Sequence, residues 1–303
     1  MNRRDFLKAG LTGAAGLLAG GLLGRDAHQP LAYAAQQWPD LVVVHGSDPG
    51  KMARAAVQAL GGIKRFVPEG AKVVLKPNAS FARKPEMATT THPWVVKATV
   101  QMCREAGAKQ VLAIDRTLDE FRACEAANGI KPATESAGGV YLSAMQQALY
   151  EEVSIPHGKA IQSDLVERDV LNADVLINLP IAKHHGGGVV TIGMKNWMGV
   201  NWNRGSYHSI GLHQCIADLS TRVKPKLILV DCFRVLIDGG PGGPGQIRQP
   251  QVLVAGTDPV AADCYACRYL YRDPNDVAHL KIAAQMGLGQ FDLSQLKIAT
   301  IEA

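Results

Sequence analysis

From Leu41 onward, the sequence alternates short apolar runs with stretches of helical periodicity. The runs are rich in β-branched residues and start near residues 41, 73, 111, 174, 227 and 251. Segments with helical periodicity separate most of them, so we expect neighbouring strands to pair in parallel. The alternation predicts an α/β fold with a mainly parallel sheet flanked by helices.

Residues 116–170 are less regular than the rest of the chain. We expect helices at 119–127 and 141–150, and short strands near 153–155 and 160–162. No Ser/Gly-rich linker divides residues 40–303. We therefore expect residues 35–303 to form a single α/β domain with an irregular central insertion, and two lobes with a cleft between them are the alternative.

The N-terminal residues 1–34 have the features of an export signal. Arg3 and Arg4 precede Phe-Leu-Lys, a weakly apolar stretch covers 9–23, and Ala32-Tyr-Ala34 places small residues before a cleavage point. The segment resembles a twin-arginine (Tat) signal. It predicts that the Tat translocase exports the chain to the periplasm or an equivalent compartment, while an ordinary Sec signal or a retained anchor is the alternative.

The apolar part of this segment is too short to serve as a permanent anchor. It is about 15 residues long and interrupted by glycines, whereas a bilayer span needs about 20 apolar residues. We therefore expect no permanent membrane span. The Tat route carries folded proteins, often with a cofactor already inserted, so the resemblance also implies a bound cofactor.

The charge of the chain argues against a nucleic-acid partner. Lys and Arg number 32 against 27 Asp and Glu, for a net charge of +5, and the basic residues are scattered. The predicted signal carries four basic and two acidic residues, so its removal lowers the net charge from +5 to +3. A nucleic-acid partner is therefore disfavoured, and part of the basic charge belongs to the predicted signal.

Polar residues follow several of the apolar runs, at the point where each strand is expected to end. These strand ends are Lys76-Pro77-Asn78, Asp115-Arg116-Thr117, the segment 180–188 after a strand that ends on Pro180, and Asp231-Cys232. Ligands of open parallel sheets bind beyond the carboxyl ends of the strands. We therefore expect an anion or metal site where these groups converge.

The most informative segment is 183–199. Lys183 and two histidines precede Gly186, Gly187 and Gly188, and a helix near 189–198 carries Lys195 and Asn196. Consecutive glycines before a helix allow backbone N–H groups to approach an anion, and the helix N-terminus favours negative charge. We predict that Lys76, Asn78, Lys183, the three glycines and Asn196 bind a ligand or cofactor. A flexible glycine turn with solvated lysines is the alternative.

The histidines allow proton transfer or metal binding. His185, His208 and Lys195 are the candidate catalytic residues, because imidazole and amine groups exchange protons. His184, His185, His208 and His213, with Asp218, are a candidate metal set. His208 and His213 are five residues apart and do not share a helix face. For each histidine, a hydrogen-bonding or substrate-contact role is the stronger expectation than metal ligation, and the identity of any metal stays open.

Six cysteines allow further chemistry. Cys264 and Cys267 are three apart in an expected helix, which is compatible with a redox pair or with half of an iron–sulfur site. Buried thiols, or a disulfide to Cys215 or Cys232 after export, are the simpler alternatives. The Gly/Pro-rich loop 238–245 either covers a site or joins two strands.

Several motifs in order resemble the domain-of-unknown-function family 362. They are Lys76-Pro77-Asn78, Thr91-His92-Pro93, Asn178-Leu-Pro180 with Lys183 and His185, Gly193-x-Lys195-Asn196 with Gly199, Asp231, Gly240-Pro241, and Thr257-Asp258-Pro259 through Asp263. The resemblance spans nearly all of 41–285. It implies a Tat-exported member. Some relatives are fused to ferredoxin domains or described as iron–sulfur proteins, but this chain lacks the ferredoxin module.

The general plan is also similar to that of the lactate racemase family, whose nickel-pincer cofactor is held by Lys and His. Asp115-Arg116-Thr117 matches that family's Asp-x-x-Arg-x-Thr signature only loosely. The parallel concerns architecture and does not carry chemistry.

Three functions follow from these patterns. The first is an exported enzyme whose Lys/His/Asn-lined cleft binds an anionic substrate or cofactor. The second is a binding or accessory protein that holds a metal, cofactor or anion without catalysis. The third is an iron–sulfur electron-transfer protein.

Overall fold

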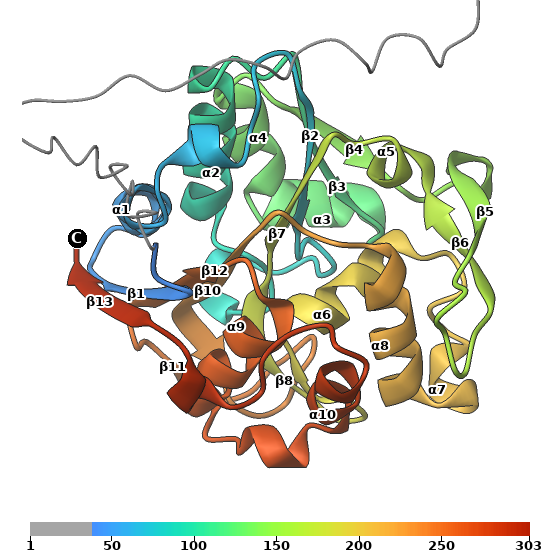
Figure 1. Cartoon of the computed structure of the whole chain (residues 1–303). Helices are drawn as coiled ribbons and strands as arrows, with labels where there is room; N and C mark the ends of the chain where they lie inside the picture. The colour runs from blue at the N-terminus through green and yellow to red at the C-terminus, as the bar shows by residue number, and fades with distance from the viewer. Residues whose placement is uncertain (1–37) are drawn as a thin grey trace, which may run out of the picture. The chain divides into compact units, whose positions relative to one another are not determined.

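The structure is a computed structural model that describes residues 38–303, and its centre is a sheet of eleven strands (Figure 1). The predicted signal peptide, residues 1–34, lies outside the described residues. The strands are β1 (Leu41–His45), β2 (Lys72–Pro77), β3 (Gln110–Asp115), β4 (Val140–Ser143), β7 (Val175–Leu179), β8 (Ile181–His185), β9 (Val189–Thr191), β10 (Leu227–Leu236), β11 (Ile247–Arg248), β12 (Val252–Gly256) and β13 (Ile298–Glu302).

The main path of the sheet is β13-β1-β12-β10-β7-β2-β3-β4. Strands β10, β7, β2, β3 and β4 pair in parallel, as do β1 and β13. Strand β12 is antiparallel to both of its neighbours. The prediction of an α/β fold with a mainly parallel sheet is confirmed. The expectation that the strand near 251 runs with the others is wrong, because a Gly/Pro loop without a crossover helix joins β10 to β12.

Helices cover both faces of this sheet. They are α1 (Pro49–Ala59), α2 (Pro93–Glu105), α3 (Phe121–Ala127), α4 (Ile130–Ser136), α5 (Arg168–Leu171), α6 (Gly193–Asn196), α7 (Tyr207–Ile210), α8 (Leu212–Arg222), α9 (Pro259–Ala266) and α10 (Ala278–Gln285). In Figure 1, α1, α2 and α4 lie together on one side, and α8, α9 and α10 lie on the other. Within residues 38–303, no helix is both long enough and apolar enough to cross a bilayer.

The alternation of side chains along each strand builds two apolar cores. Val42 and Val44 pack with α1 and α2, whereas Val43 packs in the core that contains α8, α9 and α10. In the same way Val73 and Leu75 face one core and Val74 faces the other. Strands buried on both faces explain why the runs are apolar throughout.

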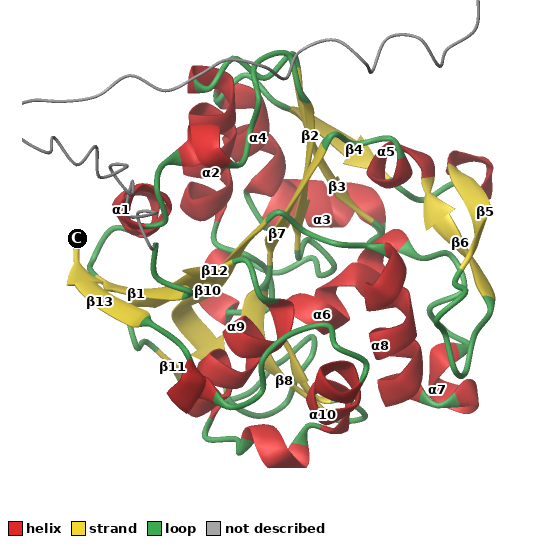
Figure 2. Cartoon of the chain, viewed as in Figure 1, coloured by secondary structure: helices red, strands yellow, loops and turns green. Residues whose placement is uncertain are grey.

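The central insertion contains the least accurately predicted elements. A helix over 141–150 is wrong, because Val140–Ser143 joins the sheet edge as β4 and Tyr141 stacks on Phe121. The short strand expected near 153–155 overlaps β5 (Tyr150–Ser154), but the one expected near 160–162 is misplaced, because its strand, β6 (Ser163–Glu167), begins only at Ser163. Strands β5 and β6 form a separate two-stranded sheet (Figure 2). The strand expected to end on Pro180 resumes beyond it as β8, which continues along β10.

Candidate functional site

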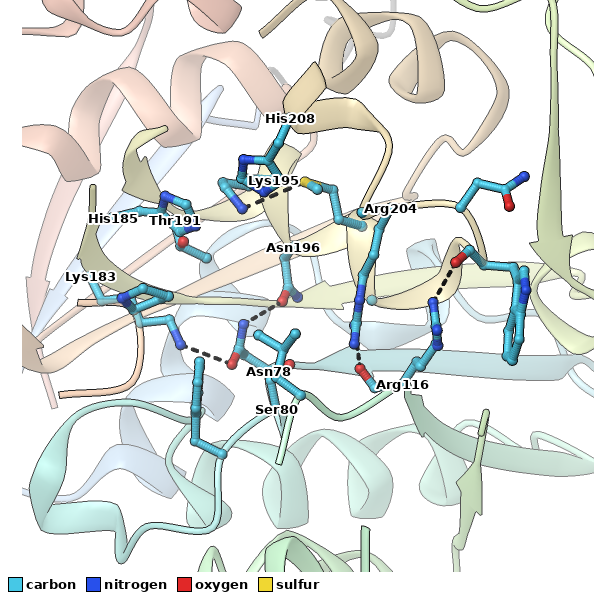
Figure 3. A pocket seen from close by; sticks show the side chains of 18 of the residues that line it. Asn78, Ser80, Arg116, Lys183, His185, Thr191, Lys195, Asn196, Arg204 and His208 are labelled. Carbon is cyan, nitrogen blue, oxygen red and sulfur yellow. Dashed lines mark hydrogen bonds between the residues drawn. The ribbon is translucent and has the colours of Figure 1, made fainter. Parts of the chain in front are cut away.

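A cavity of about 640 Å³ lies where β2 and β3 end and where β8 turns back into β9 (Figure 3). It is at the carboxyl edge of the parallel strands, as predicted. Its basic lining residues are Arg116, Lys183, His185, Lys195, Arg204 and His208. Of the described residues that line it, none is Asp or Glu.

One side of the cavity is built by the β8–β9 hairpin. Lys183 and Thr191 are paired across the two strands, so their side chains share a face, and His185 follows Lys183 by two residues on that same face. All three line the cavity. The antiparallel pairing of two short strands therefore gathers residues that are up to eight positions apart.

The three glycines form the turn of this hairpin. Gly186 and Gly187 are exposed, and none of the three is among the residues that line the cavity. The expectation that a helix follows Gly188 directly is wrong, because β9 intervenes and α6 starts only at Gly193. The first N–H groups of α6 are already bonded to the Asp263 carboxylate. Neither feature leaves a helix N-terminus open to a ligand.

Lys183 is buried beside two oxygen acceptors. Its Nζ donates to Asn78 Oδ1 at 3.1 Å and to the carbonyl of Thr89, and it lies 4.5 Å from the ring centre of Phe81. Burial, followed by the nearby Lys195, holds the pKa of Lys183 well below its usual range. No carboxylate touches this amine in the described part of the chain.

Lys195 is buried with even fewer polar partners. Its side chain is 8% exposed, and its Nζ is 3.5 Å from the Met198 thioether, which is a weak acceptor. Burial, and then the charge of Arg204, lowers the pKa of Lys195 to about 8. The ammonium form still predominates at neutral pH, although it lacks a counter-charge.

His185 has a defined tautomer. Its Nδ1 accepts a hydrogen bond from the Gly188 N–H at 3.0 Å. Burial, and then the charge of Lys195, lowers the pKa of His185 to about 3, so the ring is neutral at pH 7. A neutral imidazole that accepts at Nδ1 carries its proton on Nε2. His185 is thus a donor through Nε2, and His208, stacked on it with ring centres 6.1 Å apart, is the more exposed imidazole.

Lys76 lies next to the cavity but does not line it. It is fully buried, and its Nζ pairs with Asp115 Oδ1 at 2.9 Å and donates to the Pro77 carbonyl at 2.6 Å. Gly199 covers this pair closely, because a Cβ there would lie 2.1 Å from Asp115 Oδ1. Lys76 is therefore neutralised within the protein.

Asn196 lines the cavity, but its amide is fully used by the protein. Its Nδ2 donates to the Lys76 carbonyl and to Asn178 Oδ1, both at 2.9 Å. Its Oδ1 accepts from Asn78 Nδ2 at 3.0 Å and from Lys76 Nζ at 3.4 Å. The amide connects α6 to β2 and β7. It also holds Asn78 so that the Asn78 Oδ1 accepts from the Lys183 amine.

The opposite side of the cavity contains two arginines that each donate to two backbone carbonyls, while the Arg116 Nε is buried without a partner. Arg204 donates to the carbonyls of Arg116 and Thr117, and Arg116 donates to the carbonyls of Asn201 and Trp202 (Figure 3). The Arg116 guanidinium also lies 4.1 Å from the ring centre of Trp202. Arg204 was not among the predicted site residues, because it lies in an irregular loop without a local motif.

One protein family matches the part of the sequence that builds this cavity. The sequence model of a family described as Domain of unknown function (DUF362) matches residues 73–268, more than half of the chain. The protein belongs to the DUF362 family. The match includes the cavity-lining residues from Asn78 to Pro241.

Two known proteins are similar to this DUF362 protein, one in sequence and one in structure. The Thylakoid-associated protein sll1697 of Synechocystis sp. is 28% identical over 254 residues, which are 78% of this chain and 74% of that protein. The lactate racemase apoprotein from Thermoanaerobacterium thermosaccharolyticum has a TM-score of 0.44 at 12% identity, covering 75% of this chain. The DUF362 chain spans only 56% of that structure's length, and a likeness of this size says nothing about activity.

The candidate metal set of this DUF362 protein does not come together. His184 Nδ1 accepts from the Gly240 N–H, and Asp218 accepts from the N–H groups of Ala160 and Ile161. His213 faces His279 with 3.0 Å between their Nδ1 atoms. Among residues 38–303, no three His, Cys, Asp or Glu side chains are grouped so that they could hold a metal ion.

The six cysteines are all buried and free. Burial raises the pKa of the Cys264 thiol to about 12, which is the opposite of what a reactive thiolate needs. The DUF362 fold described here therefore offers neither a disulfide nor a cluster of thiolate ligands within residues 38–303.

Two other predicted groups also lie outside the cavity or at its rim. Asp231 is in the middle of β10, which continues to Leu236, and its carboxylate accepts from the N–H groups of His92 and Phe233. The loop 238–245 of the DUF362 protein joins β10 to β11 and also places Pro241 in the cavity wall.

Proposed function

We propose that this protein binds a small anionic molecule in the cavity described above. The observation that carries the proposal is the pair of buried lysines, Lys183 and Lys195, in a cavity whose described lining contains no carboxylate. Removing an ammonium group from water costs several kcal/mol unless a counter-charge is close. A bound anion would supply that counter-charge to both lysines at once.

The neutral His185 and the Asn196 amide narrow the chemical class of this ligand. His185 Nε2 adds a donor beside the two amines, while the Asn196 amide is already saturated by protein groups. The binding groups are thus donors only, which suits the oxygens of a carboxylate, sulfate or phosphate. Lys76 is paired with Asp115, so we assign it a structural role beside the cavity and no contact with the ligand.

Titration calorimetry with sulfate, inorganic phosphate and acetate tests this function. We expect Lys195→Met to weaken binding by about 1–3 kcal/mol, which is the usual value of a charged hydrogen bond. Lys109→Met, which removes an exposed lysine outside the cavity, is the matched control. Equal affinities for wild type and both variants, or no binding and no co-purifying anion by native mass spectrometry, would refute the proposal.

A second candidate function is proton exchange with the bound anion. It is favoured by the neighbouring imidazoles of His185 and His208 and by the pKa of about 8 at Lys195. In this second function Lys195 and His185 bind the anionic group. His208 takes a proton from the carbon next to that group in the same molecule and then returns a proton to it. Pyruvate in D2O is a suitable probe: deuterium uptake at its methyl group should exceed the rate without protein, and His208→Asn should abolish that excess.

We also propose that the Tat pathway exports the chain. The proposal rests on Arg3-Arg4 before a weakly apolar stretch and on Ala32-Tyr-Ala34. Lysine at both arginine positions should leave the precursor unprocessed in fractionated cells. Normal processing of that variant to a mature chain starting near Ala35 would refute Tat export without affecting the ligand site.

A further inference from the structure

Helix α6 is one α-helical turn that continues into a 3-10 turn over Trp197–Val200, and it supplies two lining residues of the cavity, Lys195 and Asn196. A helix of four residues has little stability of its own, because its backbone makes few internal hydrogen bonds. Its preceding residue, Ile192, has no side chain that could cap it. The position of Lys195 must therefore be set by contacts from outside the turn.

Asp263 provides that contact from a different helix. It lies on α9 and is fully buried, and its two oxygens accept from the N–H groups of Gly193 and Met194 at 2.8 and 2.9 Å. A carboxylate from α9 thus takes the place of the N-cap that α6 lacks. Asp263 itself is not among the residues that line the cavity.

The sequence at Gly193 is adapted to this close approach. A Cβ at position 193 would lie 2.7 Å from Asp263 Oδ1, so only glycine leaves room for the carboxylate. The Gly193 carbonyl accepts from Asn178 Nδ2 at 2.8 Å. At the other end of the turn, the four hydrogen bonds of the Asn196 amide attach it to β2 and β7.

We propose that Asp263 is a positioning residue of the anion site, which fixes the α6 turn and thereby directs the Lys195 amine into the cavity. Lys195 has no polar partner strong enough to orient it, since its Nζ meets only the Met198 thioether. Its direction consequently depends on the backbone that carries it. The inference rests on the proposed function, but the position of Lys195 is measurable without any ligand.

The experiment compares Asp263→Ala with Asp218→Ala. Asp218 is also a fully buried carboxylate that accepts from two consecutive backbone N–H groups, those of Ala160 and Ile161 at 2.7 and 3.1 Å. The loop that Asp218 holds contributes no residue to the cavity. Both variants lose two backbone N–H bonds, and Asp218→Ala also loses the bond from Gln214 Nε2 at 2.8 Å. Loss of stability alone would therefore affect Asp218→Ala at least as much as Asp263→Ala.

Two readouts separate positioning from stability. The first is the pH profile of Lys195 acetylation by a soluble acylating reagent, followed by mass spectrometry of the peptide. The second is the dissociation constant for sulfate. We expect Asp263→Ala to shift the acetylation profile of Lys195 and to weaken sulfate binding about tenfold, whereas Asp218→Ala leaves both at wild-type values. Equal results for the two variants would overturn the proposal.

Gly193→Ala keeps the inference testable if Asp263→Ala does not fold. The added methyl group pushes against Asp263 Oδ1 and should displace the same turn. A wild-type acetylation profile in a folded Gly193→Ala protein would then count against the proposal. If wild type binds no sulfate but the acetylation profile shifts only in the Asp263 and Gly193 variants, Asp263 positions Lys195 and the proposed anion binding is wrong.

Discussion

The two sides of the cavity carry similar charge but differ in how their donors are used. On the lysine side, formed by Lys183, His185 and Lys195, the Lys195 amine meets a thioether, and no residue of 38–303 accepts a hydrogen bond from the His185 Nε2. On the arginine side, formed by Arg116 and Arg204, the guanidinium groups donate to four backbone carbonyls. The two guanidinium groups are thus held by the protein's own carbonyls, although the Arg116 Nε has no partner, whereas the Lys195 amine meets no strong acceptor.

The buried pair Lys76–Asp115 reinforces this contrast. It lies beside the lysine side, yet its amine has a carboxylate at 2.9 Å and a carbonyl at 2.6 Å. Three lysines in neighbouring positions thus have different roles, because only one of them received an acidic partner from another strand. The following predictions, from the largest expected effect to the smallest, test whether the two sides differ in this way.

The largest effect is expected on the arginine side. Arg204→Met leaves the carbonyls of Arg116 and Thr117 without their donors, and each buried group left unsatisfied costs about 1–3 kcal/mol. The free energy of unfolding in urea should fall by about that amount or more. An unchanged unfolding midpoint would show that the Arg204 hydrogen bonds do not stabilise the fold. The proposed difference between the two sides of the cavity would then be wrong.

The pH dependence of anion binding is the next largest effect. Lys195, with a pKa of about 8, loses its charge as the pH rises through that value, so sulfate affinity should fall above pH 8 by up to about tenfold per pH unit. Sulfate is a suitable probe because its own charge is constant in this range. Lys195→Arg, which stays charged, should flatten the curve; an equally steep curve in that variant would assign the titration to another group.

A smaller effect of opposite sign is expected for stability without ligand. The pKa of Lys195 is lowered in the fold, from 10.5 to about 8, so the unfolded chain binds the proton more tightly. Wild type should therefore gain stability relative to Lys195→Met as the pH rises from about 8 towards 10.5. Below pH 8, Lys195→Met should be at least as stable as wild type in chemical unfolding. A large loss of stability in this variant would place Lys195 among the structural cations.

The smallest effect is expected at Trp202. Trp202→Phe keeps a ring under the Arg116 guanidinium but weakens the cation–π contact, which is worth about 0.5–1 kcal/mol at partly exposed sites. Thermal unfolding should detect this loss, and sulfate affinity should not change. A weaker affinity without a change in stability would instead make Trp202 a ligand contact.

Much of the fold could be predicted because the signals are local. Buried parallel strands and amphipathic helices have different periods, and Pro93 and Asp258-Pro259 mark helix starts that the structure contains. The position of the cavity also followed from sequence, since parallel strands bring their carboxyl ends to one edge. For that reason the sequence alone predicts that five residues lie near one another: Asn78, Lys183, His185, Lys195 and Asn196.

What the tertiary structure decided is which of these polar groups satisfy each other. Local periodicity carries no information about the carboxylate that Lys76 receives from β3, the carboxylate that α6 receives from α9, or the carbonyls that occupy Arg204. It also could not show that the three glycines turn a hairpin, because a glycine run is compatible with several turns. Side-chain partners are chosen by segments far apart in the sequence, and those partners determine which buried charges remain for a ligand.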